Sequence, residues 1–129
     1  MPLAFVIEDD EAVCGLIAAT LAQLGIESAT FATARAALAA LNDRVPAIIF
    51  LDIALHQSDA IDVIKGLNDR RYGGVVQVIS GQRPWLLGAV QRTGLRHDLT
   101  LLPPMLKPVR PEMISKAVAD AGLAPPAQA

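Results

Sequence analysis

The stretch LAFVIEDDEAVCGLIAATLAQLG, residues 3–25, joins three unlike pieces. Its first five residues form a short continuous apolar run, which is typical of a strand that is buried on both faces. Residues 11–24 repeat apolar side chains at helical spacing, and Gly25 is well placed to end that helix. Four consecutive acids, residues 8–11, lie between the two. The stretch therefore predicts a strand, an acidic turn and a helix.

The same alternation continues along the rest of the chain. Further strands are predicted over residues 26–31, 47–52, 75–80 and 98–102, and further helices over residues 33–44, 59–71, 84–94 and 111–122. Asp59 is suited to cap the helix that it begins. Five strands that alternate with five helices predict an α/β fold: a five-stranded parallel sheet, doubly wound into a three-layer sandwich. Right-handed crossovers leave few other arrangements.

Length and composition bound the class of protein. The 129 residues fit one domain that can bury a core, and 53% are hydrophobic. The net charge of −2 comes with no basic run, so direct DNA binding is not expected. No apolar run reaches the roughly 20 residues that a bilayer requires, and the N-terminus lacks the basic start of a signal peptide. The single cysteine fits a reducing compartment. We therefore expect a cytoplasmic domain that does not contact a membrane.

Side chains that can carry chemistry follow four of the predicted strands. Glu8 and Asp9 follow the first strand, and Asp52 ends the third. Ser80 ends the fourth strand, and Lys107 lies a few residues after the fifth. Ligands of open parallel sheets bind at the carboxyl ends of the strands, so we expect these side chains to converge there.

This set of side chains suits phosphoryl chemistry. Carboxylates that meet at hydrogen-bonding distance do not all stay ionised without a cation. Mg²⁺ takes oxygen ligands, keeps several waters and neutralises phosphate oxygens. An aspartate at the end of an apolar strand is a credible nucleophile for an aspartyl phosphate. A lysine and a hydroxyl can then hold the remaining phosphoryl oxygens.

Plainer interpretations exist for each residue taken alone. Acids in the first turn of a helix are stabilised by its dipole, and Asp10 and Glu11 fit that role better than the two acids before them. Ser80 by itself could be a turn residue, and Lys107 a solvated lysine. Only the whole set favours a site.

Four short motifs occur in the order, and nearly at the spacings, found in the receiver domain of two-component response regulators: VIEDDEAV, IIFLDIAL, VISG and LKP. Each motif alone is unspecific, but together they cover nearly the whole chain. The chain therefore resembles a stand-alone, CheY-like receiver with the flavodoxin-like form of the fold. The resemblance implies a receiver domain over residues 1–122 and a short C-terminal tail over 123–129.

The resemblance also implies roles for individual residues. Asp52 matches the phosphoacceptor. Glu8 and Asp9 match the acidic pair that binds Mg²⁺ together with Asp52, and Ala54 would add its backbone carbonyl to the metal.

Two more positions match on the phosphate side of the site. Ser80 matches the switch hydroxyl, and Lys107 matches the lysine that pairs with the phosphoryl group. The Lys107–Pro108 bond resembles the family's usual cis peptide, which would aim the lysine into the pocket.

The chain departs from the family pattern at three positions. His56 and Ala60 stand where the family usually has proline and glycine. Pro104 stands where it usually has an aromatic residue that follows the switch hydroxyl. Because prolines do not donate ladder hydrogen bonds, we expect the fifth strand to end by Leu102. A backbone shift within residues 96–106 would then replace the aromatic readout.

The leading hypothesis is a bacterial phosphorelay protein. A sensor histidine kinase or phosphotransfer protein would donate its phosphoryl group to Asp52 in the presence of Mg²⁺. The change would reach a downstream protein effector, or a second copy of the chain, through the surface of residues 84–94, 98–102 and 111–122. Since no effector domain follows residue 122, output is expected through protein contact.

Two alternatives belong to other classes. One is a receiver-like interaction module that signals without phosphorylation: the departures at His56, Ala60 and Pro104 keep this alternative open, but the retained acids and lysine weigh against it. The other is an aspartate-dependent phosphatase. Such enzymes need a second acid two positions after the nucleophile, and this chain has Ala54 there. The protein is therefore not expected to be a conventional enzyme, although it could hydrolyse its own acyl phosphate.

Overall fold

The computed structural model describes residues 2–53, 57–81, 88, 92 and 99–123. The described strands are β1 (Leu3–Ile7), β2 (Glu27–Phe31), β3 (Ile48–Asp52), β4 (Val75–Ser80), β5 (Thr100–Leu101) and β6 (Met105–Leu106). They form one sheet in the order β2-β1-β3-β4-β5, and β6 also pairs with β4. All these pairs are parallel, so the carboxyl ends of the strands lie at one edge.

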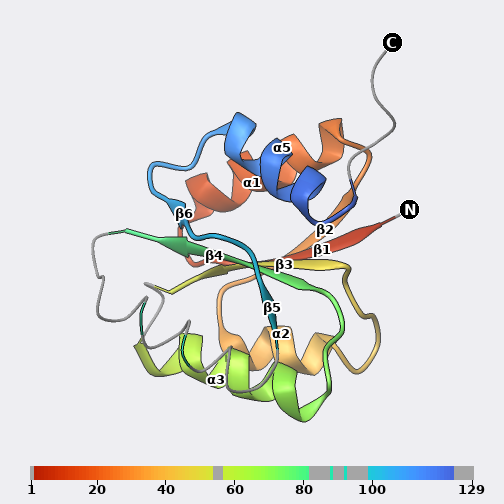
Figure 1. Ribbon diagram of the computed structural model, residues 1–129, viewed down its shortest axis with the longest axis vertical. Helices are drawn as coiled ribbons and strands as arrows, with labels where there is room; N and C mark the ends of the chain where they lie inside the picture. Colours follow the sequence, from red (N-terminus) through yellow and green to blue (C-terminus); the bar gives the residue numbers. More distant parts are fainter. Residues whose placement is uncertain (1, 54–56, 82–87, 89–91, 93–98, 124–129) are drawn as a thin grey trace.

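Helices cover both faces of this sheet (Figure 1). Helices α1 (Glu11–Gln23) and α5 (Pro111–Asp120) lie on one face, and α2 (Ala34–Ala40) and α3 (Gln57–Asp69) on the other. Each pair of helices closes its own hydrophobic core against the sheet. The predicted three-layer α/β sandwich is therefore confirmed.

The central strands are apolar throughout because both of their faces are covered. All five residues of β1 are buried. Phe5 and Ile7 pack into the core beneath α2 and α3, whereas Ala4 and Val6 pack beneath α1 and α5. A continuous apolar run, rather than an alternating one, is the pattern that such strands require.

Helix ends agree with the predictions at α1 and differ at α2 and α3. Helix α1 ends where Gly25 adopts a positive φ of 77°, as its sequence indicates. Helix α2 already ends at Ala40. The prediction that Asp59 caps α3 was wrong, because the helix begins two residues earlier, at Gln57. Within the described part of the chain, no helix combines the length and apolar character that a bilayer span requires.

The fifth position of the sheet is built differently from the prediction. A single strand over 98–102 was expected, but two two-residue strands occupy this edge, β5 before the proline pair and β6 after it. The strand does end before Pro103, as its missing N–H predicts. The return of the chain to the sheet at Met105 was not predicted. Of the helix expected over 84–94 only residues 88 and 92 are described, and the tail after 123 lies outside the described residues.

Candidate functional site

Strand register brings the acids of β1 and β3 together. Ile7 pairs with Leu51, so the next residues along the two strands, Glu8 and Asp52, lie side by side. Asp52 pairs in turn with Ile79, one residue before Ser80. Glu8, Asp52 and Ser80 are at most 2% exposed. Three polar side chains are thus buried at the edge where parallel sheets bind ligands.

The carboxylates of Glu8, Asp9 and Asp52 form a cluster. One oxygen from each lies within 4.8 Å of the others. Glu8 and Asp52 are buried, whereas Asp9 is exposed and borders the solvent. The cluster therefore offers oxygen atoms from three acids, open to solvent on one side.

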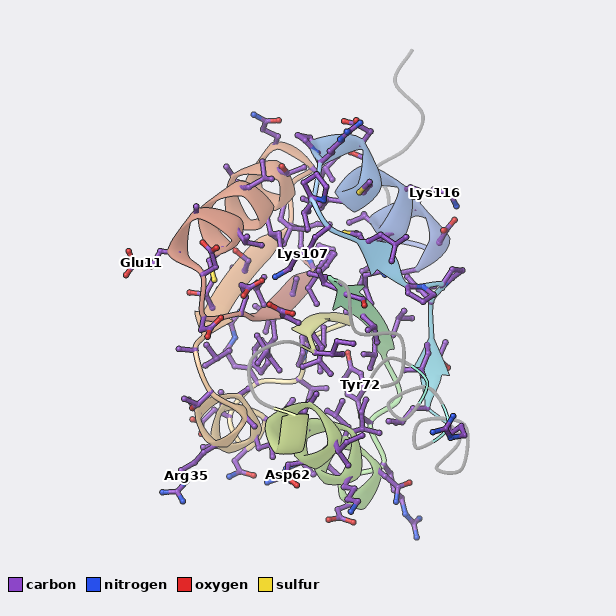
Figure 2. The ribbon with its side chains drawn as sticks, turned by 90° about the vertical axis from the view of Figure 1, so that its left-hand side faces the viewer. Glu11, Arg35, Asp62, Tyr72, Lys107 and Lys116 are labelled. Atoms are coloured by element: carbon purple, nitrogen blue, oxygen red, sulfur yellow. The ribbon has the colours of Figure 1, made fainter. Side chains whose placement is uncertain are left out.

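Lys107 enters this cluster from the neighbouring edge of the sheet. Its Nζ donates to Asp52 Oδ2 at 2.9 Å and lies 3.5 Å from Glu8 Oε1. Figure 2 shows Lys107 between the two helix layers, away from the outward-pointing Arg35 and Asp62. Its backbone N–H donates to the Ser80 carbonyl at 2.9 Å, and the Lys107–Pro108 bond is cis. The lysine is thus anchored to β4 beside Ser80.

Burial and mutual charge shift the ionisation of this group. Burial raises the pKa of Glu8 to about 8, and a hydrogen bond with Asp52 and repulsion by its charge act in the same direction. Burial by itself would lower the pKa of Lys107, but its hydrogen bond and attraction to Asp52, with help from Glu8, raise the pKa overall. One ammonium therefore does not offset the burial of Glu8, whose raised pKa favours the protonated carboxyl near neutral pH.

The donor set fits a hard divalent cation. Glu8 Oε1 is buried and has no hydrogen-bond partner among the described residues, although Lys107 lies nearby. A buried carboxylate oxygen without a hydrogen bond is costly unless a cation or proton meets it. Mg²⁺ binds a few carboxylate oxygens and retains waters, which suits a cluster with one exposed member. Glu8, Asp9 and Asp52 are the residues that would hold it.

The run of four acids divides as its sequence suggests. Asp10 is the N-cap of α1, and its Oδ1 accepts from the backbone N–H groups of Ala12 and Val13. Glu11 is exposed in the first turn of that helix. The N–H of Asp10 donates to Glu8 Oε2 at 3.2 Å, so the helix start also orients the buried glutamate. Helix start and carboxylate cluster are adjacent and share one hydrogen bond.

Some predicted features fall elsewhere. Ala54 and His56 lie outside the described residues, so the backbone carbonyl ligand stays a prediction. Ala60 is fully buried in α3.

Sequence reasoning missed Gln77, a polar residue within the apolar strand VVQVIS that is only 3% exposed. A lone amide in such a run was the available signal.

Comparisons with known proteins agree with this geometry. The family described as "Response regulator receiver domain" matches residues 4–95, which include the three clustered acids and Ser80 but not Lys107. No curated protein sequence matches the chain at a significant level.

Solved structures resemble the chain over nearly its whole length. NtrX from Brucella abortus is 27% identical with a TM-score of 0.76; the match covers 95% of this chain and 26% of that one. A response regulator receiver protein from Burkholderia phymatum is 25% identical with a TM-score of 0.71; the match covers 98% of this chain and all of that one. A CheY-like receiver domain protein from Methanospirillum hungatei is 18% identical with a TM-score of 0.79; the match covers 93% of this chain and 92% of that one. At this identity the likeness concerns the fold alone. The chain thus spans about a quarter of the NtrX chain and essentially all of the Burkholderia one.

Proposed function

Since this chain belongs to the response regulator receiver domain family, we propose that Asp52 accepts a phosphoryl group from a phosphorylated histidine of a partner protein. The observation that carries the proposal is the meeting of Asp52, Glu8, Asp9 and Lys107 at one edge of the sheet. Glu8, Asp9 and Lys107 all lie within reach of Asp52, although they come from distant parts of the chain.

In the proposed reaction an Asp52 carboxylate oxygen bonds to phosphorus while the bond from phosphorus to the imidazole nitrogen breaks. The bonding electron pair returns to the imidazole, which takes a proton from solvent. Burial of Asp52 removes water from the nucleophile, and Lys107 holds it by a 2.9 Å hydrogen bond. After transfer the same ammonium would pair with a phosphoryl oxygen, and the hydroxyl of Ser80, which follows the β4 partner of Asp52, would donate to another.

Mg²⁺ bound by Glu8, Asp9 and Asp52 would neutralise charge on the phosphoryl oxygens. The chain's own contribution is to bring three carboxylates together and to keep Glu8 buried. That arrangement is unfavourable without a cation, as the raised pKa of Glu8 indicates.

We propose that the signal leaves through protein contacts. The acyl phosphate carries about two negative charges beside Lys107 and Ser80, where the ionised Asp52 carboxylate carried one. Both residues connect directly to β6, so the sheet edge of β5 and β6 and the adjoining α5 are where a downstream protein would bind. In this proposal the protein is a cytoplasmic phosphoacceptor rather than an enzyme that turns over external substrates, and hydrolysis of its own acyl phosphate ends the signal.

Binding of beryllofluoride, a mimic of the acyl phosphate, tests the proposal. ¹⁹F NMR of the protein with Mg²⁺ and beryllofluoride should show a bound fluoride signal that Asp52→Asn abolishes. Asp62→Asn on the exposed side of α3 is the matched control and should bind normally. If wild type shows no bound signal, or if Asp52→Asn retains it, the proposal is wrong and an interaction module that works without phosphorylation is favoured.

A further inference from the structure

The edge of the sheet next to β4 contains one extra residue. Val76 pairs with Leu101, and three residues later Ile79 pairs with Met105, which lies four residues after Leu101. The segment that joins β5 to β6 therefore has one residue more than the part of β4 that it faces, and this segment contains Pro103 and Pro104. An extra residue in one strand of a pair is a β-bulge, a feature that often re-aims a neighbouring side chain near a functional site.

The side chain of Gln77 spans this bulge. Its Nε2 donates to the Val78 carbonyl at 3.0 Å and to the Pro103 carbonyl at 2.9 Å. A proline pair supplies no N–H to the ladder, so no backbone donor comes from residues 103 and 104 themselves. The carboxamide supplies donors at this point and ties the bulged segment to β4.

Packing supports the two sides of the bulge unequally. Gln77, Pro103 and Pro104 line a cavity of about 300 Å³ between this sheet edge and α5. Strand β6 has only two residues: Met105 is buried in the core beneath α1 and α5, whereas Leu106 is 59% exposed. The burial of Met105 and the hydrogen bonds of Gln77 therefore act together to fix the point where the chain rejoins the sheet.

The point of return determines where Lys107 lies. Leu106 pairs with Ser80, and the next residue donates its N–H to the Ser80 carbonyl. A slip of β6 by one residue would turn its side chains to the opposite face and take the Lys107 ammonium away from Asp52. The 2.9 Å contact between that ammonium and Asp52 thus depends on the register after the bulge.

We propose that Gln77 is a positioning residue: its carboxamide fixes the register in which β6 rejoins β4 and so delivers Lys107 to the phosphoryl group on Asp52. This inference rests on the proposed function for its consequence, but not for the register itself.

The test compares Gln77→Met with Tyr72→Phe. Methionine keeps the length of the side chain and removes the donors. Tyr72 is the matched control because its buried hydroxyl also donates to a proline carbonyl, that of Pro46, at 2.9 Å, at the other end of the sheet. Gln77→Asn, which keeps the amide on a shorter side chain, is a milder second variant in case the methionine variant does not fold.

Two measurements are made on each protein. In the metal-free protein, hydrogen exchange of the Lys107 amide should be about tenfold faster in Gln77→Met, whereas the Ala47 amide, bonded to the Leu3 carbonyl, should be unchanged. With metal, beryllofluoride affinity measured by ¹⁹F NMR should fall about tenfold while Mg²⁺ affinity stays within about twofold, because the lysine is not a metal ligand. Gln77→Asn should show the same pattern, smaller in size. Tyr72→Phe should leave the Lys107 amide and beryllofluoride affinity as in wild type.

Other results would overturn the inference. Unchanged exchange of the Lys107 amide in both Gln77 variants would show that the bulge holds without the carboxamide. An equal loss of Mg²⁺ and beryllofluoride affinity would show a general effect on the fold rather than positioning of the lysine. If wild type does not bind beryllofluoride but the exchange pattern is as expected, the proposed function fails and the role of Gln77 in fixing the register of β6 stands.

Discussion

Replacement of Glu8 by glutamine should remove most of the pH dependence of Mg²⁺ binding. The pKa of the buried Glu8 carboxyl is raised from 4.5 to about 8, so near neutral pH the metal-free site retains a proton. Mg²⁺ needs the ionised carboxylate, and binding therefore releases that proton. The affinity should rise as the pH rises toward about 8 and level off above it.

The size of the effect follows from the pKa. With a pKa of about 8, roughly one molecule in a hundred carries the carboxylate at pH 6, and about half do at pH 8. The apparent Mg²⁺ affinity should therefore increase about fiftyfold between these two pH values. In the metal-free protein the free energy of unfolding depends on pH in the opposite sense to the Mg²⁺ affinity: it falls as the pH rises. A raised pKa stabilises the fold below about pH 4.5, and this contribution is lost as the pH rises through about 8.

Isothermal titration calorimetry at several pH values, in buffers of different ionisation enthalpy, gives both the affinity and the number of protons released. Glu8→Gln should bind Mg²⁺ more weakly but vary less than about threefold over the same range. Glu11→Gln is the control, because this acid is exposed in the first turn of α1 and should keep the full dependence. A wild-type affinity that is flat between pH 6 and pH 8, or a fiftyfold change that persists in Glu8→Gln, would refute the reasoning.

Three further predictions concern other residues of the site, the start of α1 and the start of β4. Lys107→Met should weaken beryllofluoride binding by about tenfold or more, since it removes a charge-assisted hydrogen bond, while Mg²⁺ binding measured by calorimetry is retained; loss of both affinities together would contradict the assignment. Asp9→Asn should lower Mg²⁺ affinity with little change in thermal stability. Asp10→Ala removes the cap of α1, so it should lower the free energy of unfolding by about 1 kcal/mol in urea melts and leave Mg²⁺ affinity unchanged. The reverse pattern would contradict the division of the acidic run into metal ligands and helix cap. Gly74→Ala should destabilise the protein by about 2 kcal/mol, because an added Cβ would lie 2.7 Å from the Ala47 carbonyl oxygen, and an unchanged urea midpoint would argue against this close approach.

Much of the site could be predicted because it depends on where strands end. The apolar runs before Glu8 and Asp52 identify buried strands, and parallel strands bring their carboxyl ends to one edge. Asp10 was recognisable as a helix start from its place directly before a helical repeat. These features follow from local sequence patterns, and the parallel sheet brings the residues at its strand ends close together.

The register beyond the proline pair could not be predicted in the same way. Pro103 and Pro104 indicate a break in the strand, but not that the chain returns one residue out of step. That return depends on a tertiary hydrogen bond from Gln77, 26 residues earlier in the chain. The start of α3 at Gln57 was also missed, since an acid that suits a cap fits equally well inside the first turn.

The most direct test of the central claim is covalent modification of Asp52. The protein is incubated with Mg²⁺ and acetyl phosphate, and intact-protein mass spectrometry follows the gain of one phosphoryl group. We expect wild type and Asp62→Asn to gain it, and Asp52→Asn not to. Removal of Mg²⁺ by a chelator should prevent the gain, and hydroxylamine, which cleaves acyl phosphates, should reverse it. A wild-type protein that gains no phosphoryl group under these conditions, or an Asp52→Asn protein that gains one as readily, would contradict the account.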